Sequence, residues 1–320
     1  MRDASAVRAG GRRGAGIPFE KWHGAGNDFV IGDARAGGPW HGVLGDGAEA
    51  VAAIAKAACD RHFGVGGDGL LLATDDPAGG PGAIAMRMWN PDGSESEMCG
   101  NGLRCFGAWL HARGEFLPGR HVVSTGAGRL TVAVESGGRV SVDMGRPWLS
   151  ASAIPVVGAT ESPDGITSVS VPSCDDSDSG PWLDATCVSM GNPHAVIFVT
   201  RVQDVPLSSL GPTLEHHGAF PRRTNVEVCE IVDRGAVAVR VWERGAGLTL
   251  ACGTGACAVM VAARLHGLVD QRAEIRLPGG TLIAEWAGGR GDVGHAVTLS
   301  GPAVRTFVGT WLDSGGERLA

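Results

Sequence analysis

Two segments of the chain share one unusual pattern, and this internal repeat limits the possible folds more than any other feature. Residues 99–114 read CGNGLRCFGAWLHARG, and residues 252–267 read CGTGACAVMVAARLHG. Each copy begins with a Cys-Gly-x-Gly turn and continues as an apolar stretch of helical length that ends at a glycine. The copies begin nearly half a chain length apart. A duplicated domain, with one such helix in each half, is the economical explanation.

Other segments predict the elements around these helices. Apolar periodicity and turn residues predict strands at residues 19–22, 29–32, 70–73, 84–89, 122–124, 130–134, 140–144, 185–189, 195–199, 226–232, 237–242, 274–277, 281–285, 296–299 and 304–308. Helices are expected at residues 48–60, 99–113, 207–216 and 252–266. The stretch 158–180 is rich in Ser, Asp, Gly and Pro, which predicts a surface loop.

The length of the chain indicates two domains. A chain of 320 residues exceeds the roughly 250 residues at which single cores stop growing. Residues 1–16 carry four arginines, one acidic residue and no large apolar cluster. Such a segment buries too little surface to order itself, so we expect a disordered extension there.

The cysteines that begin the two expected helices can perform acid/base chemistry. A helix N-terminus offers free N–H groups and a partial positive charge, which stabilise a thiolate and predict a lowered pKa for Cys99 and Cys252. The same N–H groups can bind a carboxylate. Two such turns facing one another would hold one carboxylate and place a sulfur on each face of its α-carbon. This arrangement suits racemisation, in which one group removes the α-proton and another returns a proton from the opposite side.

Two simpler explanations compete with this interpretation. A lone cysteine at a helix start is most often a small packing residue, but two in repeat positions make that explanation weak. A zinc site would use the pairs Cys99/Cys105 and Cys252/Cys257. Neither pair has the usual spacing of two to four residues, so no metal site is expected.

The charge and composition of the chain limit the classes of partner that we expect it to bind. A net charge of −7 gives no basic field for a phosphate backbone, so nucleic acid is not expected. Eight scattered cysteines without a C-x-x-C pair or a secretory leader predict reduced thiols in a cytoplasmic protein. No run approaches the roughly 18 apolar residues of a membrane span, so no membrane partner is expected. A small-molecule substrate fits best.

Two cofactor sites can be examined from the sequence. Residues 64–69, GVGGDG, match G-x-G-x-x-G, but they follow an expected helix and precede a strand, the reverse of a dinucleotide site. A pyridoxal-phosphate racemase needs a Schiff-base lysine. The chain has only Lys21 and Lys56, and neither has a phosphate-binding loop nearby.

Several motifs together resemble the diaminopimelate epimerase family. They are HGAGNDF at 23–29, NPDGSESEMCGNGLRC at 90–105, MGNPH at 190–194, RTNVE at 223–227 and ERGAGLTLACGTGACA at 243–258. The resemblance covers residues 17 to 312, and the joint pattern is highly specific. The chain departs from the family at Trp89 and Trp242, where Tyr is frequent, and at Gly67 and Pro91.

The resemblance implies roles for particular residues. Cys99 and Cys252 correspond to the acid/base pair, and His194 and Glu243 to groups that support catalysis. The implied substrate-binding residues are Asn27, Asn90, Gly100, Asn101, Asn192, Asn225, Glu243, Arg244, Gly253 and Thr254. Of these, Gly100, Asn101, Gly253 and Thr254 offer amides to the reacting carboxylate. The others line the distal end of the substrate, where Arg244 can pair with a carboxylate and Glu243 with an ammonium.

The family also implies a fold and a reaction. We expect an α+β protein of two pseudo-symmetric domains, each a curved mixed β-sheet wrapped around a central helix. The expected domains are residues 17–146, completed by 301–312, and residues 147–300. The implied reaction interconverts LL- and meso-diaminopimelate without metal or organic cofactor, in lysine and peptidoglycan precursor biosynthesis, and the implied assembly is a homodimer.

Three alternatives remain open from the sequence. The chain could be a proline racemase or hydroxyproline epimerase, although these typically carry His where Asn101 stands and lack the Glu243–Arg244 pair. It could act on another diamino or basic amino acid. A binding protein without catalysis is the third alternative, and the presence of both cysteines argues against it.

Overall fold

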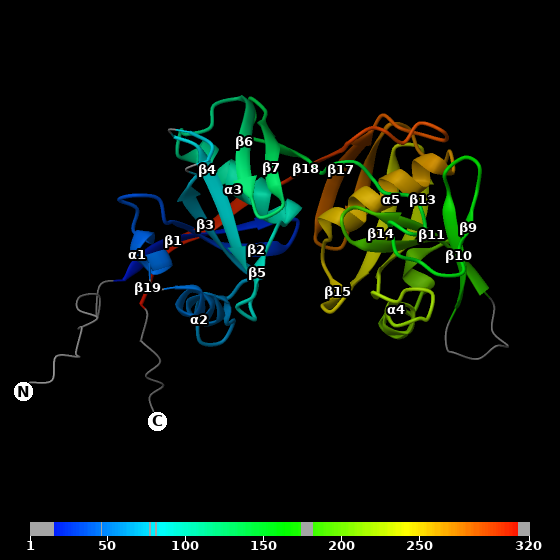
Figure 1. Ribbon diagram of the computed structural model, residues 1–320, viewed down its shortest axis with the longest axis horizontal. Helices are drawn as coiled ribbons and strands as arrows, with labels where there is room; N and C mark the ends of the chain where they lie inside the picture. Colours follow the sequence, from blue (N-terminus) through cyan, green and yellow to red (C-terminus); the bar gives the residue numbers. More distant parts are fainter. Residues whose placement is uncertain (1–15, 46, 77, 81, 174–181, 313–320) are drawn as a thin grey trace, which may run out of the picture.

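The computed structural model describes residues 16–312, apart from residues 46, 77, 81 and 174–181. The chain forms two lobes that lie side by side, with β18 between them (Figure 1). Each lobe has one long helix surrounded by strands, α3 in the first and α5 in the second. The expected disordered extension at residues 1–16 lies outside the described residues, except for Gly16.

The first lobe contains the N-terminal elements and the last strand of the chain. Its helices are α1 (His41–Gly45), α2 (Ala48–Cys59) and α3 (Gly100–Ala112). Its strands are β1 (Ile17–Gly24), β2 (Asn27–Asp33), β3 (Gly69–Asp75), β4 (Ile84–Trp89), β5 (Glu95–Ser96), β6 (Gly119–Thr125), β7 (Gly128–Val134), β8 (Val140–Asp143) and β19 (Val304–Trp311).

The second lobe repeats this plan. Its helices are the 3-10 turn η1 (Val202–Asp204), α4 (Leu207–Glu215) and α5 (Gly253–Leu265). Its strands are β9 (Thr160–Glu161), β10 (Thr167–Pro172), β11 (Trp182–Ser189), β12 (Pro193–Phe198), β13 (Asn225–Asp233), β14 (Ala236–Glu243), β15 (Gly247–Thr249), β16 (Arg272–Leu277), β17 (Gly280–Trp286) and β18 (Val297–Gly301).

Strand pairing shows the duplication directly. In the first lobe β1 pairs antiparallel with β2, β2 parallel with β3, β3 antiparallel with β4, and β4 parallel with β6. In the second lobe β11, β12, β13, β14 and β16 follow the same sequence of antiparallel and parallel pairings. In both lobes the long helix makes the crossover between the last two strands of this series, so α3 and α5 occupy equivalent positions. The prediction of two similar mixed sheets around central helices is confirmed.

One strand pairing and one return of the chain connect the lobes. β8 pairs antiparallel with β18, with Val142 opposite Leu299, so the two sheets form one continuous hydrogen-bonded sheet. After β18 the chain returns to the first lobe, where β19 pairs antiparallel with β1. These pairings support the proposed domains of residues 17–146 with 301–312 and residues 147–300, and the boundaries stay a prediction.

The two long helices are buried because they are apolar on nearly every side. In α3 every residue from Gly100 to Leu110 is buried, and α5 is buried except for Thr254 and Arg264. Both helices and the sheet surfaces that face them belong to one apolar cluster. The helix starts are therefore held firmly by the core. No helix among the described residues is long and apolar enough to cross a membrane.

The expected surface loop at residues 158–180 is wrong in part. Two strands, β9 and β10, lie within it, and β10 pairs with β11. In β10 the side chains of Thr167, Val169 and Val171 are buried while Ser170 is exposed. This alternation is the period of a strand, and the Ser, Asp and Gly residues on either side hid it. Residues 174–180 of the expected loop lie outside the described residues.

Candidate active site

Both predicted catalytic cysteines are N-caps of the long helices. Cys99 has extended backbone angles before α3, and its Sγ accepts a hydrogen bond from Gly102 N at 3.4 Å. Cys252 occupies the same position before α5, and its Sγ accepts from Gly255 N at 3.3 Å. Each sulfur therefore takes the place of the oxygen of a usual N-cap side chain. The local structure that the Cys-Gly-x-Gly pattern predicted is present at both helices.

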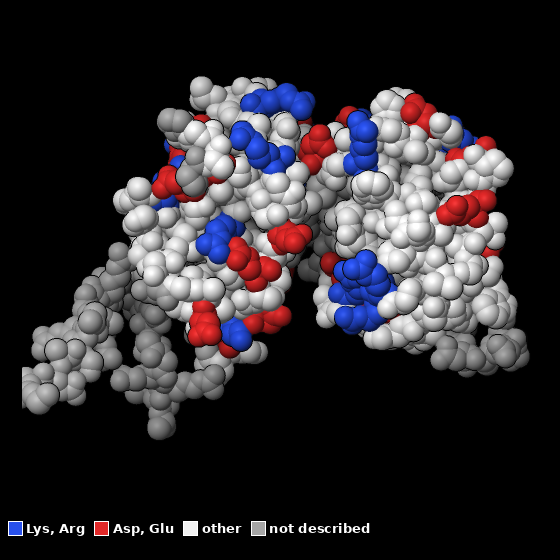
Figure 2. Space-filling view, viewed as in Figure 1, with Lys and Arg blue, Asp and Glu red and all other residues white. Residues whose placement is uncertain are grey.

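The first turns of the two helices meet at the junction between the lobes. Asn101 Nδ2 lies 3.5 Å from the carbonyl oxygen of Ala251, the residue before Cys252. A Cβ on Gly253 would lie 3.4 Å from Asn101 Oδ1. The predicted carboxylate-binding residues Gly100, Asn101, Gly253 and Thr254 are thus brought together. Figure 2 shows the surface hollowed between the two lobes on one face, with acidic and basic side chains interspersed around it.

Burial reverses the expected direction of the thiol pKa shifts. Desolvation raises the pKa of Cys99 above its usual value and raises that of Cys252 well above it. The helix amide of Gly102 or Gly255 lowers the pKa in each case, as predicted, but by less than burial raises it. The prediction of lowered pKa values is therefore wrong, because sequence patterns reveal helix starts but not solvent exclusion.

Glu243 acts on both cysteines. Its negative charge raises the pKa of the Cys99 thiol and of the Cys252 thiol, so the two sulfurs share one electrostatic environment. Burial in turn raises the pKa of the Glu243 carboxyl, while the nearby Thr249 hydroxyl and Cys252 thiol lower it by less. The position of Glu243 at the end of β14 thus agrees with its predicted role beside the thiols.

His194 belongs to a buried group that includes a residue not predicted from the sequence. His194 has no exposed surface, and its Nδ1 lies 2.7 Å from Glu227 Oε1. Its Nε2 lies 3.0 Å from Oδ1 of the predicted Asn192. Glu227 is also fully buried, and its charge raises the pKa of Cys252. A lone glutamate between Val226 and Val228 in an apolar strand was the sequence signal for this residue.

The predicted distal residues are arranged around the turn after β14. Asn225 Nδ2 donates to Pro193 O at 2.8 Å, and Asn225 Oδ1 accepts from Arg244 N at 3.0 Å. The Arg244 guanidinium donates to Arg222 O. Glu215 of α4, which sequence reasoning missed, also holds this turn by accepting from Gly245 N at 2.9 Å. Asn225 and Glu215 therefore fix the backbone that carries Glu243 and Arg244.

Two predicted asparagines of the first lobe differ in their surroundings. Asn27 begins β2, and its Oδ1 lies 3.8 Å from Cys99 Sγ and 3.2 Å from Asn101 Nδ2. Asn90 lies in the turn between β4 and β5, where its Nδ2 donates to Ser94 Oγ at 3.0 Å. Asn27 is thus placed at the thiol, whereas the described contacts of Asn90 belong to its own turn. A substrate contact for Asn90 stays a prediction.

The two tryptophans that depart from the family pattern pack outside the apolar cluster that contains the cysteines. Trp242 donates from Nε1 to Glu215 Oε2 at 2.7 Å and covers Gly211 of α4, where any Cβ would overlap its ring. Trp89 is buried in a second apolar cluster of the first lobe, together with Trp40 and Val51. Both indoles therefore serve packing and leave the polar groups of the site in place.

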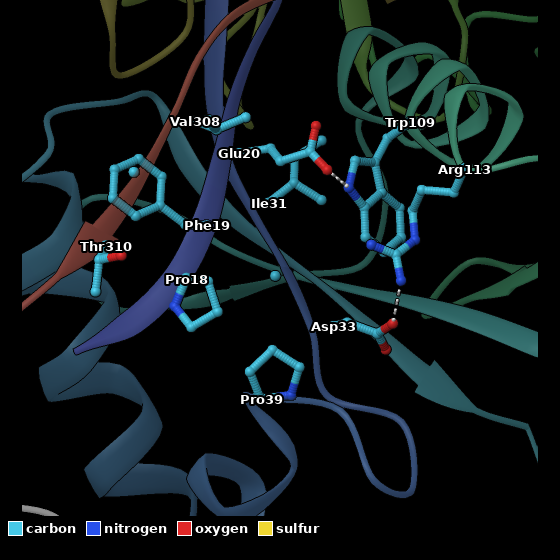
Figure 3. Close-up of a pocket in the computed structure, with 12 residues that line it drawn as sticks. Pro18, Phe19, Glu20, Ile31, Asp33, Pro39, Trp109, Arg113, Val308 and Thr310 are labelled. Carbon is cyan, nitrogen blue, oxygen red and sulfur yellow. Dashed lines mark hydrogen bonds and ion pairs between the residues drawn. The ribbon is translucent and has the colours of Figure 1, made fainter. Parts of the chain in front are cut away.

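A separate cavity of about 440 Å³ lies in the first lobe among β1, β2, β19 and α3. Figure 3 shows its lining, in which the Trp109 indole donates a hydrogen bond to Glu20 and Arg113 forms an ion pair with Asp33. Neither cysteine lines this cavity. Its charged groups already have partners, so the helix starts, and not this cavity, form the candidate active site.

Solved structures with the same fold come from several groups of proteins. A phenazine biosynthesis protein of the PhzF family from Bacillus anthracis matches with a TM-score of 0.64 at 18% identity, over 92% of this chain and 98% of that one. A hydroxyproline epimerase from Agrobacterium vitis, solved with bound trans-4-hydroxy-L-proline, matches with a TM-score of 0.62 at 16% identity, over 95% and 94%. These likenesses show the fold, and together with the site they define the class: a two-lobed α+β protein with a cysteine at the start of the central helix of each lobe.

Sequence comparison gives the family. The diaminopimelate epimerase family model matches residues 19–149 and 186–305, and the chain belongs to this family. The diaminopimelate epimerase of Synechococcus elongatus is 44% identical over 294 residues, which cover 92% of this chain and 98% of the relative. A chloroplastic diaminopimelate epimerase of Oryza sativa subsp. japonica is 43% identical over 304 residues, which cover 92% and 80%. The resemblance seen in the sequence motifs is confirmed.

Proposed function

We infer that this protein is a diaminopimelate epimerase, an isomerase of lysine biosynthesis that interconverts LL- and meso-diaminopimelate. The observation that carries the inference is the pair of cysteines at two helix starts that meet at the lobe junction, in a chain of this family. Such a pair offers one sulfur to each face of a single carbon.

The proposed mechanism uses one cysteine as base and the other as acid. One thiolate removes the α-proton, and the opposite thiol donates a proton to the other face, so the configuration inverts without any other group. The amides at the starts of α3 and α5 stabilise the charge that develops on the carboxylate. Desolvation raises the pKa of both thiols, and the α-ammonium of the bound substrate opposes this shift because a positive charge favours the thiolate.

The distal end of the substrate provides specificity in this proposal. Arg244 pairs with the second carboxylate, and Glu243, together with Asn192 and Asn225, faces the second ammonium. His194 and Glu227 support Cys252 from the buried side. A hydroxyproline or proline substrate has no second amino-acid end, so this set of charged groups favours diaminopimelate over those alternatives.

Proton exchange with solvent tests the proposed function. The reduced, chelator-treated protein is incubated in deuterated water with LL-diaminopimelate, and NMR follows the α-position; L-proline and L-lysine are run in parallel. We expect deuterium to enter diaminopimelate alone, with formation of the meso isomer. Exchange into proline or lysine instead would assign the protein to a related substrate, and exchange into none of them would contradict the proposed chemistry.

The cysteine roles have their own test. Cys99→Ser and Cys252→Ser should each lower kcat/KM for epimerisation by at least about 10³-fold, because each removes one of the two proton-transfer groups. Cys187→Ala is the matched control, since Cys187 is a buried thiol of β11 in the other apolar cluster of the second lobe. Full activity in either serine variant would exclude the two-thiol mechanism.

A homodimer is part of the proposal. Among the described strands β19 pairs with β1 alone, and its Val304, Phe307 and Val308 are exposed large apolar side chains. An exposed apolar strand at a sheet edge is suited to pack against a second copy of the protein. Phe307→Glu should convert the protein to monomers in sedimentation analysis. Val122→Glu, at a similarly exposed apolar residue of β6, should leave the dimer intact.

A cytoplasmic location is also proposed. The seven cysteines in the described part of the chain are all free thiols, which fits a reducing compartment. The rice relative is chloroplastic by name, so the compartment can differ within the family. Cell fractionation with an antibody against the protein would locate it, and recovery in an oxidising compartment would contradict the proposal.

A further inference from the structure

Four side chains form a continuous chain of hydrogen bonds behind Cys99. Arg104 Nη2 donates to Asn101 Oδ1 at 2.7 Å, and Asn101 Nδ2 donates to Asn27 Oδ1 at 3.2 Å. Asn27 Nδ2 in turn donates to Asp68 Oδ2 at 2.7 Å. The chain begins at a cation in α3 and ends at a carboxylate just before β3. Sequence reasoning assigned no role to Arg104 or Asp68.

Arg104 and Asp68, at the two ends of this series of hydrogen bonds, determine the orientation of the two asparagine amides between them. A guanidinium only donates hydrogen bonds and an ionised carboxylate only accepts them. Asn101 must therefore present its oxygen to Arg104, and Asn27 its nitrogen to Asp68. Both remaining amide groups then satisfy one another. As a result the oxygen of Asn27, and not its nitrogen, lies 3.8 Å from Cys99 Sγ, where it accepts a hydrogen bond from the thiol.

The surroundings of Arg104 point to a role beyond packing. Arg104 has no exposed surface, and within the described ranges its Nε and Nη1 have no hydrogen-bond partner and no carboxylate pairs with it. A Cβ on Gly24 or Gly301 would lie 3.3 Å from guanidinium nitrogens, so two glycines leave room for the group. A buried cation without a carboxylate is costly, and an apolar side chain would fill the same space at lower cost.

Asp68 is held in place from its other side. Its Oδ1 accepts from Arg61 Nη2 at 2.7 Å, and its Oδ2 also accepts from Asp28 N at 3.0 Å. Arg61 and Lys21 both pair with the Asp28 carboxylate. The glycine-rich segment 64–69, which does not form a dinucleotide site, contains Asp68 and places its carboxylate beside the Asn27 side chain.

We propose that Asp68 and Arg104 are positioning residues that, through Asn27 and Asn101, fix the Asn27 amide with its oxygen toward the Cys99 thiol. The inference rests on the acid/base role proposed for Cys99. If the Asn27 amide turned over, its nitrogen would donate to the sulfur and favour the thiolate, so the two ends of the chain set the protonation behaviour of this cysteine. The other groups that act on Cys99 are the amides of Asn101 and Gly102, the charge of Glu243 and the charge of Arg104 itself.

The rate of alkylation of Cys99 as a function of pH tests the Asp68 end. Iodoacetamide is used as the probe, and peptide mass spectrometry reads Cys99 and Cys252 separately in each sample. In Asp68→Asn the Asn27 amide is free to turn, so the pH midpoint for Cys99 should fall by about half a unit or more. In the Asn27→Ala background the same Asp68→Asn change should produce no shift, because the amide that transmits it is absent.

The control separates the hydrogen bond from the loss of a charge. Asp28→Asn removes a carboxylate from the same ion cluster, and the Asp28 side chain does not bond Asn27. It should leave the Cys99 midpoint unchanged. An equal shift in Asp28→Asn, or an undiminished shift in the Asn27→Ala background, would show that only the electrostatic field matters and would overturn the proposal.

Two variants test the other end. Arg104→Met removes a charge that lowers the Cys99 pKa and also the donor that orients Asn101, so its shift of the Cys99 midpoint should differ between the wild-type and Asn27→Ala backgrounds, while the Cys252 midpoint stays in place. An identical shift in both backgrounds would contradict the proposal. Arg104→Lys, which keeps a cation and a donor, should restore most of the wild-type midpoint. If the methionine variant does not fold, the lysine variant alone must keep the wild-type midpoint. Equal shifts of both cysteines would indicate a loosened site and contradict the proposal. Alkylation needs no turnover, so these outcomes are independent of the deuterium-exchange result.

Discussion

At the scale of single residues, Glu243 has the widest influence on the candidate active site. It lies at the end of β14, is partly buried, and acts on the thiols of both Cys99 and Cys252. Burial raises the pKa of Glu243, and Glu227 raises it further. The negative charge of Glu243 therefore opposes ionisation of each thiol.

Replacement of Glu243 by glutamine should show how far the Glu243 charge determines the pKa of the Cys252 thiol. Glu243→Gln keeps the shape of the side chain and removes its charge, so alkylation of Cys252 should move to lower pH. The variant also loses its partner for the substrate ammonium, and kcat/KM should fall by about 10²- to 10⁴-fold. Steady-state epimerisation and the pH dependence of Cys252 alkylation measure the two effects. An unchanged or higher alkylation midpoint would show that the carboxylate does not act on this thiol.

The same substitution should change stability with a definite sign. Because the folded-state pKa of Glu243 is raised, its contribution to stability is present below its unfolded value of 4.5 and is lost as pH rises through the folded value. Glu243→Gln should therefore raise Tm relative to the wild type at pH 7.5 and make little difference at pH 4. Calorimetry at the two pH values checks this. A lower Tm for the variant at pH 7.5 would reverse the sign and contradict the assignment.

At the scale of elements, α3 and α5 share one design but differ in the space around their first turns. Gly102 and Gly255 occupy equivalent positions, and each donates its N–H to the preceding cysteine sulfur. A Cβ on Gly102 would meet only ordinary contacts, at 3.4 Å or more. A Cβ on Gly255 would lie 2.7 Å from Glu227 Oε1 and 3.3 Å from Cys252 Sγ. The second helix start is therefore the more tightly enclosed.

This difference gives a matched pair of variants. Gly102→Ala should keep activity within about threefold and leave stability unchanged or raise it by about 0.5–1 kcal/mol, because alanine suits a helix better. Gly255→Ala should lower stability by about 1–3 kcal/mol and reduce kcat at least tenfold, since Glu227 or Cys252 must move. Denaturant unfolding and steady-state kinetics on both proteins test the pair. Equal behaviour of the two variants would contradict the asymmetry.

Sequence patterns predicted the helix starts well because those depend on local residues. The Cys-Gly-x-Gly turns place α3 and α5, and apolar periodicity places most strands. The same patterns could not identify Asp68, Glu215 or Glu227 as neighbours of the site, since their partners are distant in the sequence or lie on another element. They could not identify Arg104 because its complete burial depends on the packing around α3. They also predicted the wrong direction for the cysteine pKa values, because desolvation depends on how the lobes close around the thiols.

At the scale of the whole molecule, the pairing of β8 with β18 determines where the two helix starts meet. The two strands join the sheets of the lobes, and Leu299 of β18 is fully buried there. Its Cδ2 lies 3.5 Å from the position that a Cβ on Gly253 would take. A side chain on the connecting strand therefore supports the turn that carries Cys252. Packing between the lobes and geometry at the thiols should be coupled.

A pair of core variants can measure this coupling. Leu299→Ala and Leu72→Ala each truncate a fully buried leucine, and each should cost about 2–5 kcal/mol of stability. Leu72 lies in the apolar cluster between β3 and the helices α1 and α2, outside the candidate active site. At a temperature well below both transitions, only Leu299→Ala should lower kcat, by about tenfold or more, because a small displacement of a catalytic group is costly. If both variants, or neither, lost kcat at equal folded fraction, the strand between the lobes would support the fold without positioning the thiols.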